Sequence, residues 1–141
     1  MDERKAETVE GLVRRFYERL WNQWDDAAVD STLDPHFQFR GSLGDVVSGR
    51  DEWLGYRDKI RAGSSDFQNE VAELIVDGDR AAARLVYSGT HDGPLLGLPA
   101  TGRRFTYAGA AFFTADRGRL VAAWVLGDLV ALRAQLSVTA D

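Results

Sequence analysis

The chain has 141 residues, of which 45% are hydrophobic and 28% charged, with a formal net charge of −5 and no cysteine. This length and composition indicate one folded domain, residues 1–141, and exclude a disordered chain. The negative charge, with Lys and Arg spread along the chain, argues against nucleic acid as a partner. The lack of cysteine excludes disulfides and thiolate chemistry.

The N-terminal segment, MDERKAETVE, is too charged for a signal peptide, and no apolar run approaches the ~18 residues that span a bilayer. We therefore expect no membrane partner and a cytoplasmic location. The two histidines, His36 and His91, lie far apart in the sequence without metal-type spacing, so we expect no metal centre.

The first half of the chain has a helical pattern. Apolar residues at three- and four-residue spacing predict an amphipathic helix from about Thr8 to Trp24. A short helix over Asp26–Leu33 should end before Pro35, followed by an extended piece, because the residue before proline disfavours the helical conformation. The sequence Ser-Gly-Arg-Asp at 48–51 resembles a capping box and predicts a helix to about Arg61.

The second half changes to strand periodicity and ends in a helix. Asp-Gly-Asp at 77–79 and Asp-Arg-Gly at 116–118 indicate hairpin turns, whereas residues 91–103 form a longer connection. Helices followed by an antiparallel meander predict an α+β domain whose helices cover one face of a sheet. The predicted strands are Asn69–Val76, Arg80–Thr90, Arg104–Ala115 and Arg119–Gly127, and the last helix is Leu129–Leu136.

Both faces of the last predicted strand are apolar. Period two places Leu120, Ala122, Trp124 and Leu126 on one face, and the residues at 121, 123 and 125 on the other. Helices of one chain shield only one face of a sheet. We therefore expect a homodimer that packs through the other face.

Three motifs in the second half resemble one family. The motifs are Gly-Thr-His-Asp-Gly at 89–93, Gly-Leu-Pro-Ala-Thr-Gly-Arg at 97–103, and Trp124 followed by Asp128 with a closing Gln-Leu at 135–136. They resemble the SnoaL-like polyketide cyclases and ester cyclases of the NTF2-like superfamily. The resemblance implies a cone-shaped curved sheet around an internal pocket, no cofactor or metal, and Asp128 as the catalytic acid/base of an intramolecular aldol condensation.

Asp128 has two interpretations. Period two puts it on the same face as Trp124, at the end of an apolar wall where desolvation would suit it to proton transfer. Alternatively, it only caps the helix Leu129–Leu136, for which Asp is a favoured residue. The resemblance favours the catalytic interpretation.

The other candidate site residues are aromatic or basic. His91, in a loop after a strand, is a candidate proton shuttle or oxyanion donor, with loop shaping as the alternative. Arg84 and Tyr87 lie on opposite faces of their strand, and Arg84 is a candidate to steady an enolate, unless it forms a surface ion pair. The best candidates for a wall that binds a flat hydrophobic ligand are Tyr17, Trp53, Tyr56 and Trp124.

The function predicted from these features is a cofactor-independent cyclase acting on a hydrophobic polyketide-like substrate. Ala123 before Trp124 and the single proline at Pro99 depart from the family pattern, so other functions stay open. One alternative is an epoxide hydrolase, isomerase or hydroxylation-associated relative on the same fold, although the strand Arg104–Ala115 contains no Arg-x-Asp. Another is a non-catalytic protein that binds a small molecule.

Overall fold

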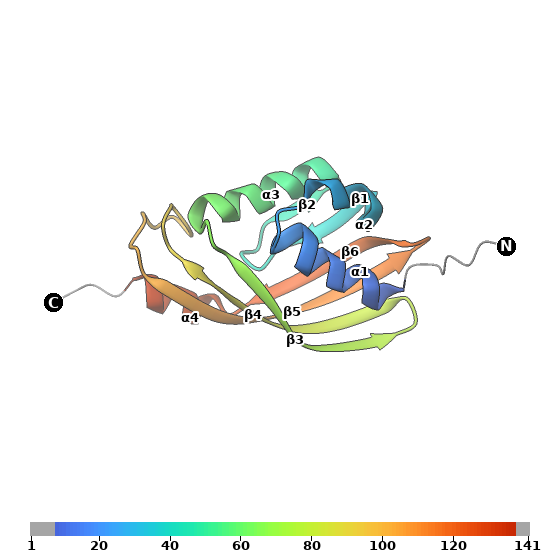
Figure 1. Ribbon diagram of the computed structural model, residues 1–141. Helices are drawn as coiled ribbons and strands as arrows, with labels where there is room; N and C mark the ends of the chain where they lie inside the picture. The colour runs from blue at the N-terminus through green and yellow to red at the C-terminus, as the bar shows by residue number, and fades with distance from the viewer. Residues whose placement is uncertain (1–7, 138–141) are drawn as a thin grey trace.

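The structure, a computed structural model, describes residues 8–137. A curved sheet of six strands forms one layer, and the helices α1 and α3 lie over its concave face (Figure 1). The sheet order is β2-β1-β6-β5-β4-β3, with all neighbours antiparallel except β1 and β6, which are parallel. This mixed, mostly antiparallel α+β fold confirms the predicted fold class.

Four of the strands were predicted from the alternation of their side chains. The structure keeps the predicted bounds of β4 and β6 and extends β3 and β5 by one or two residues. The sequence analysis missed β2, whose three residues are too few to show a period. The strands are β1 (Leu33–Arg40), β2 (Val46–Ser48), β3 (Gln68–Asp77), β4 (Arg80–Thr90), β5 (Arg104–Asp116) and β6 (Arg119–Gly127).

The first helix begins as predicted and then changes its geometry. The side chain of Thr8 caps α1 (Val9–Arg15) by accepting a hydrogen bond from Gly11 N at 3.1 Å. The helix continues as η1 (Phe16–Trp21), a π-helix with the wider turn that is often found at functional sites. The N–H of Asn22 makes the last bond of this π-helix, to the carbonyl of Tyr17, and the helix ends at Trp21, before the predicted Trp24.

The next helices differ at their ends from the prediction. The second helical segment is a 3-10 turn, η2 (Asp26–Ala28), followed by α2 (Val29–Thr32), and Pro35 lies inside β1. The third, α3 (Arg50–Gly63), has Gly49 as its N-cap without a side-chain cap, so the predicted capping box is wrong. Instead, Glu52 accepts a hydrogen bond from the backbone N–H of Ser48 at 2.9 Å. The last helix, α4 (Leu129–Leu136), has the predicted bounds.

The face assignment of β6 is corrected by an irregularity in its pairing with β5. The register shifts between Thr114 and Ala115, so Leu120 faces the core whereas Trp124 and Leu126 face outward. An extra residue in a strand switches the faces of all residues after it. The outer face therefore carries exposed aromatic side chains, and Phe112 pairs with Trp124 there, with ring centroids 6.2 Å apart.

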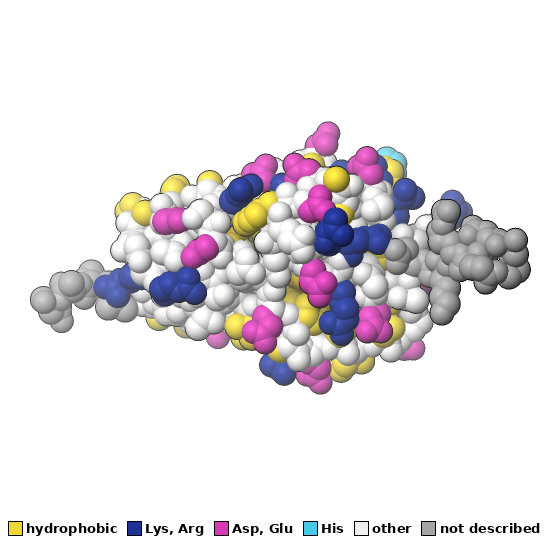
Figure 2. All heavy atoms as spheres, viewed as in Figure 1, with side chains coloured by type: hydrophobic (Ala, Val, Ile, Leu, Met, Phe, Trp, Pro, Cys, Tyr) yellow, Lys and Arg dark blue, Asp and Glu magenta, His cyan; other side chains and the backbone are white. Residues whose placement is uncertain are grey.

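The helices of the described part include none that is long and apolar enough to cross a membrane. Most of the charged N-terminal segment, for which we expect no signal peptide, lies outside the described residues. On the face drawn in Figure 2, acidic and basic side chains are interspersed, and neither sign gathers into a continuous patch.

Candidate functional site

An internal cavity lies between the concave face of the sheet, η1 and α3. It contains about 300 Å³ of space that no atom fills, and part of this space is open to solvent. Most of its wall is aromatic. The lining residues are Phe16, Tyr17, Trp21, Phe39, Ser42, Tyr56, Ile60, Phe67, Asn69, Tyr87 and Val125.

Two tyrosines of this wall have phenols that no group of the described residues hydrogen-bonds. Tyr17 comes from η1 and Tyr87 from β4, and both side chains are almost completely buried. Within residues 8–137, neither hydroxyl has a hydrogen-bond partner. Because the cavity is partly open to solvent, these two donors are available to water or to an acceptor oxygen of a ligand.

The same phenols are held in their protonated form. Burial raises the pKa of Tyr17 and of Tyr87 well above the ordinary value of 10. The neighbouring phenol of Tyr56 raises the pKa of Tyr17 further, and the phenol of Tyr17 raises that of Tyr87. Burial also raises the pKa of Tyr56 to about 12. At neutral pH these side chains are therefore hydrogen-bond donors and not bases.

The phenols of Tyr107 and Tyr56 have hydrogen-bond partners in the turn between β1 and β2. Ser42, in the turn between β1 and β2, lines the cavity and lies 3.2 Å from the hydroxyl of Tyr107. The turn packs closely on α3, because a β-carbon at Gly41 would stand 2.2 Å from the hydroxyl oxygen of Tyr56. Glycine at position 41 is thus required by space.

Asn69 adds the one amide of the cavity wall, as far as residues 8–137 show. Its backbone N–H donates to the side-chain oxygen of Asn22 at 2.8 Å, and Asn22 donates back to its carbonyl at 2.8 Å. This pair ties β3 to the end of η1 and fixes the side chain at the cavity. The sequence analysis missed Asn69, Ser42 and Tyr87 as site residues, because no motif marks them.

Asp128 lies outside this cavity. Its side chain is exposed and accepts a hydrogen bond from Ala131 N at 3.1 Å, which makes it the N-cap of α4. It does share a face with Trp124, as period two requires, but that face is the outer one. The expectation of a desolvated carboxylate in a dry pocket is therefore wrong, and the catalytic role of Asp128 stays a prediction without geometric support.

His91 is fully buried but organises its own loop. The N–H of Thr101 donates to Nδ1 at 3.3 Å, so the ring hydrogen lies on Nε2, which donates to the carbonyl of Leu98 at 3.3 Å. The hydroxyl of Thr101 is 2.9 Å from Nδ1. Both ring nitrogens are thus used within the loop, which favours the structural interpretation over the proton shuttle.

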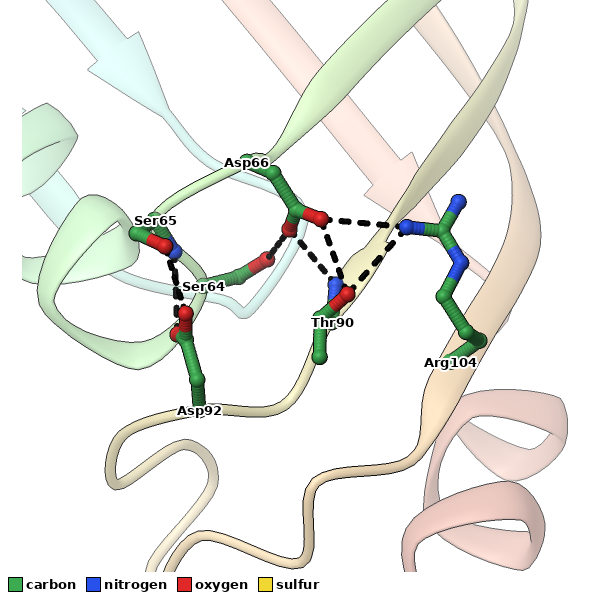
Figure 3. A network of polar contacts seen from close by, with 6 residues as sticks. All are labelled: Ser64, Ser65, Asp66, Thr90, Asp92 and Arg104. Carbon is green, nitrogen blue, oxygen red and sulfur yellow. Dashed lines mark hydrogen bonds and ion pairs between the residues drawn. The ribbon is translucent and has the colours of Figure 1, made fainter.

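A polar network fastens this loop to the segment between α3 and β3 (Figure 3). Asp66 accepts hydrogen bonds from the N–H and the hydroxyl of Thr90 at 2.7 and 2.8 Å. It also forms an ion pair with Arg104, with Nη1 and Oδ2 3.0 Å apart. Asp92 accepts a 3.0 Å hydrogen bond from the N–H of Ser65 and a second one from its hydroxyl. The Gly-Thr-His-Asp-Gly motif therefore anchors a loop in this structure.

Three other candidate residues also lie outside the cavity wall. Arg84 is exposed and pairs with Glu73 at 3.3 Å, because β4 turns Tyr87 inward and Arg84 outward. Trp124 is 45% exposed on the outer face, where Arg40 lies 4.8 Å from its ring centre. Trp53 is fully buried behind the cavity, 5.3 Å from the ring of Phe16. Only Tyr17 and Tyr56 of the predicted wall line the cavity.

The donor set of the cavity consists of phenols, one hydroxyl and one amide. Among the described residues, no group of three His, Asp or Glu side chains is placed to hold a metal ion. Such neutral donors suit carbonyl or hydroxyl oxygens of a ligand better than an anionic headgroup.

Comparison with known proteins identifies the family. The model of the SnoaL-like polyketide cyclase family matches residues 11–136. TsrD from Streptomyces laurentii is 29% identical, with 93% of this chain and 96% of that chain covered at a TM-score of 0.82. IdmH from Streptomyces antibioticus, a candidate polyketide cyclase, is 27% identical, with 92% and 99% covered at a TM-score of 0.80.

A candidate SnoaL-like polyketide cyclase from Jannaschia sp. CCS1 shares the fold, with 22% identity, 99% of each chain covered and a TM-score of 0.86. No curated protein sequence matches significantly. The family match spans the cavity walls and the anchored loop alike. The chain belongs to the SnoaL-like polyketide cyclase family.

Proposed function

We propose that the protein closes a ring in a neutral, hydrophobic, polyketide-like substrate, without a cofactor. The observation that carries the proposal is the pair of open phenol donors, Tyr17 and Tyr87, in one apolar cavity. A carbonyl oxygen between them accepts hydrogen bonds that strengthen as negative charge develops on it. The family match supports a cyclisation as the reaction class.

In this proposal the cavity contributes positioning and carbonyl polarisation. Its aromatic wall folds the substrate so that the reacting carbons meet, which by itself lowers the barrier. When the enol form of a 1,3-dicarbonyl attacks a second carbonyl, the C=C π electrons form the new C–C bond. The enol hydroxyl becomes a carbonyl, and its proton passes to the developing alkoxide, directly or through water. The phenols stabilise that alkoxide by donating hydrogen bonds to it. Among the described lining residues none is a carboxylate, so we assign no protein base to the carbon-bound proton.

The residues that line the cavity argue against an epoxide hydrolase but are compatible with a binding protein. An epoxide hydrolase of this fold needs acidic and basic side chains at the reacting carbon, and the described cavity wall contains neither. A non-catalytic binding protein is supported by the same observation, because phenol donors without a base also suit simple binding. We keep the binding function as the second candidate.

The test is turnover of a panel of aromatic polyketide methyl esters, followed by mass spectrometry for an isomeric product. We expect product with the wild type and at least tenfold slower formation with Tyr87→Phe or Tyr17→Phe, at unchanged folding. Tyr107→Phe is the matched control, because Tyr107 is buried beside Tyr87 but does not line the cavity. A retained, unchanged ligand would favour the binding protein, and equal turnover in all variants would contradict the proposal.

A further inference from the structure

Asn69 of β3 contributes a buried amide to the cavity wall, next to one of the two open phenols. Its side chain is only 6% exposed and lines the cavity, as Tyr87 does. The pairing of β3 with β4 places Asn69 directly opposite Tyr87. Residues directly opposite each other in an antiparallel pair have neighbouring β-carbons on the same face of the sheet. The amide and the phenol therefore belong to the same part of the cavity wall.

The orientation of this amide follows from its hydrogen bonds. Asn22 Oδ1 accepts a hydrogen bond from the backbone N–H of Asn69 at 2.8 Å, and Asn22 Nδ2 donates to the carbonyl of Asn69 at 2.8 Å. The atom of the Asn69 amide that lies 3.4 Å from the same Asn22 oxygen must then be a donor, which is Nδ2. The other amide atom of Asn69, Oδ1, is therefore the one turned away from Asn22.

Asn69 Oδ1 is an acceptor without a partner among residues 8–137. In that part of the chain, Trp53 Nε1 is the one side-chain polar atom that is both sealed from solvent and without a partner. Solvent therefore reaches Asn69 Oδ1, and because this side chain lines the cavity, we assign the space in front of it to the cavity. An amide oxygen accepts but does not donate, so it is available to water or to a donor group of a ligand.

The wall thus offers both donors and an acceptor to one bound molecule. In the proposed function, Tyr17 and Tyr87 donate to a carbonyl oxygen. The enol form of a 1,3-dicarbonyl and the β-hydroxy ketone that forms in an aldol addition carry a hydroxyl as well as a carbonyl, on alternate carbons. We propose that Asn69 determines specificity for such ligands by accepting a hydrogen bond from their hydroxyl through Oδ1. This proposal rests on the proposed function and names the second polar group of the same ligand.

The side chain of Asn69 can be replaced without loss of its main structural contacts. Asn22 binds the backbone N–H and carbonyl of residue 69, and both remain in Asn69→Leu. Leucine has the branched shape of asparagine but offers neither a donor nor an acceptor. Gln68→Leu is the matched control, because it removes the neighbouring amide from the exposed side of β3.

The experiment measures dissociation constants by NMR titration for 2-pentanone, 4-methoxy-2-pentanone and each enantiomer of 4-hydroxy-2-pentanone. With the wild type we expect one enantiomer of the hydroxy ketone to bind about three- to tenfold more tightly than the other two ketones, because only a hydroxyl donates to Asn69. In Asn69→Leu the hydroxy ketone should lose this advantage, whereas Gln68→Leu should keep it.

The outcomes separate this inference from the proposed function. A hydroxy ketone that binds no more tightly than the methoxy ketone, or a preference that survives Asn69→Leu, overturns the role of Asn69 and leaves the phenols as the carbonyl site. The comparison of these two ketones needs only the wild type, so it tests the acceptor independently of any variant. 2-Pentanone that does not bind, or binds equally well to Tyr87→Phe, contradicts the proposed function and this inference with it.

Discussion

Gly109 of β5 lies directly against the ring of Tyr87 on β4. A β-carbon at position 109 would stand 2.4 Å from Cε2 and 2.9 Å from the hydroxyl oxygen of Tyr87. No real side chain tolerates such contacts, so the ring, and with it the phenol, must move when any larger residue replaces the glycine. The glycine therefore determines where one of the two open donors lies.

We predict that Gly109→Ala lowers the affinity for 2,4-pentanedione about tenfold and the free energy of unfolding by about 1–3 kcal/mol. The stability loss should be smaller in a Tyr87→Leu background, as a double-mutant cycle by urea unfolding will show. Gly55→Ala is the control, because nothing lies within 4 Å of its β-carbon in α3, and it should stabilise the protein slightly. Additive losses in the cycle would show that the two residues act independently.

Asp128 should behave as a helix cap. We predict that Asp128→Asn leaves both turnover and the free energy of unfolding unchanged, because Asn caps about as well as Asp. Asp128→Ala should lower the free energy of unfolding by about 1 kcal/mol and leave turnover per folded molecule unchanged. A folded, fully stable Asp128→Asn variant without turnover would restore the carboxylate as the catalytic acid/base.

The network in Figure 3 makes stability depend on pH. Burial alone would raise the pKa of Asp66, but hydrogen bonds from Thr90 and Ser64 hold it below its ordinary 3.8. A lowered pKa in the folded state contributes stability that is present above the ordinary value and is lost as pH falls through the folded one.

We therefore predict that Asp66→Asn lowers the urea midpoint by a constant amount between pH 5 and 7. The difference from the wild type should shrink as the pH falls below about 4. Asp116→Asn, an exposed position at the end of β5, should leave the midpoint nearly unchanged throughout. A difference in urea midpoint that stays constant down to pH 2 would show that the stability from this network does not depend on the charge of the Asp66 carboxylate.

The outer face of the sheet should pair with a second copy of the chain. Phe112, Trp124 and Leu126 are 52%, 45% and 50% exposed there, although Trp124 carries a cation–π contact from Arg40. Apolar side chains gathered on one face are typical of an interface. We predict a dimer by analytical ultracentrifugation, and a monomer for Leu126→Asp. A monomeric wild type at 100 μM would contradict this.

The strands were predictable where their pattern is local. Arg80–Thr90 and Arg119–Gly127 have the predicted bounds, because alternation and turn signals mark both ends. The side on which Trp124 lies was not predictable, because a one-residue shift in pairing leaves no mark in the sequence. The π-helical turn at Phe16–Trp21 was missed for a similar reason, since its apolar spacing also fits an α-helix.

The site was less predictable than the fold. Of the four aromatic residues that the sequence analysis expects in the wall, Tyr17 and Tyr56 line the cavity. The spacing of Trp124 and Asp128 indicates a shared face but not which face, so the sequence alone does not show that this face is the outer one. Asn69 and Ser42 reach the cavity through long-range pairings that no single stretch of sequence shows.

The central claim is that Tyr17 and Tyr87 present free donors to an oxygenated ligand. Its most direct test compares the affinity for 2,4-pentanedione with the free energy of unfolding in Tyr17→Phe, Tyr87→Phe and the double variant. Because neither hydroxyl has a hydrogen-bond partner among residues 8–137, we predict unfolding free energies within about 0.5 kcal/mol of the wild type and affinities at least fivefold weaker for each single variant. Unchanged affinity in the double variant, or large losses of stability, would contradict the claim.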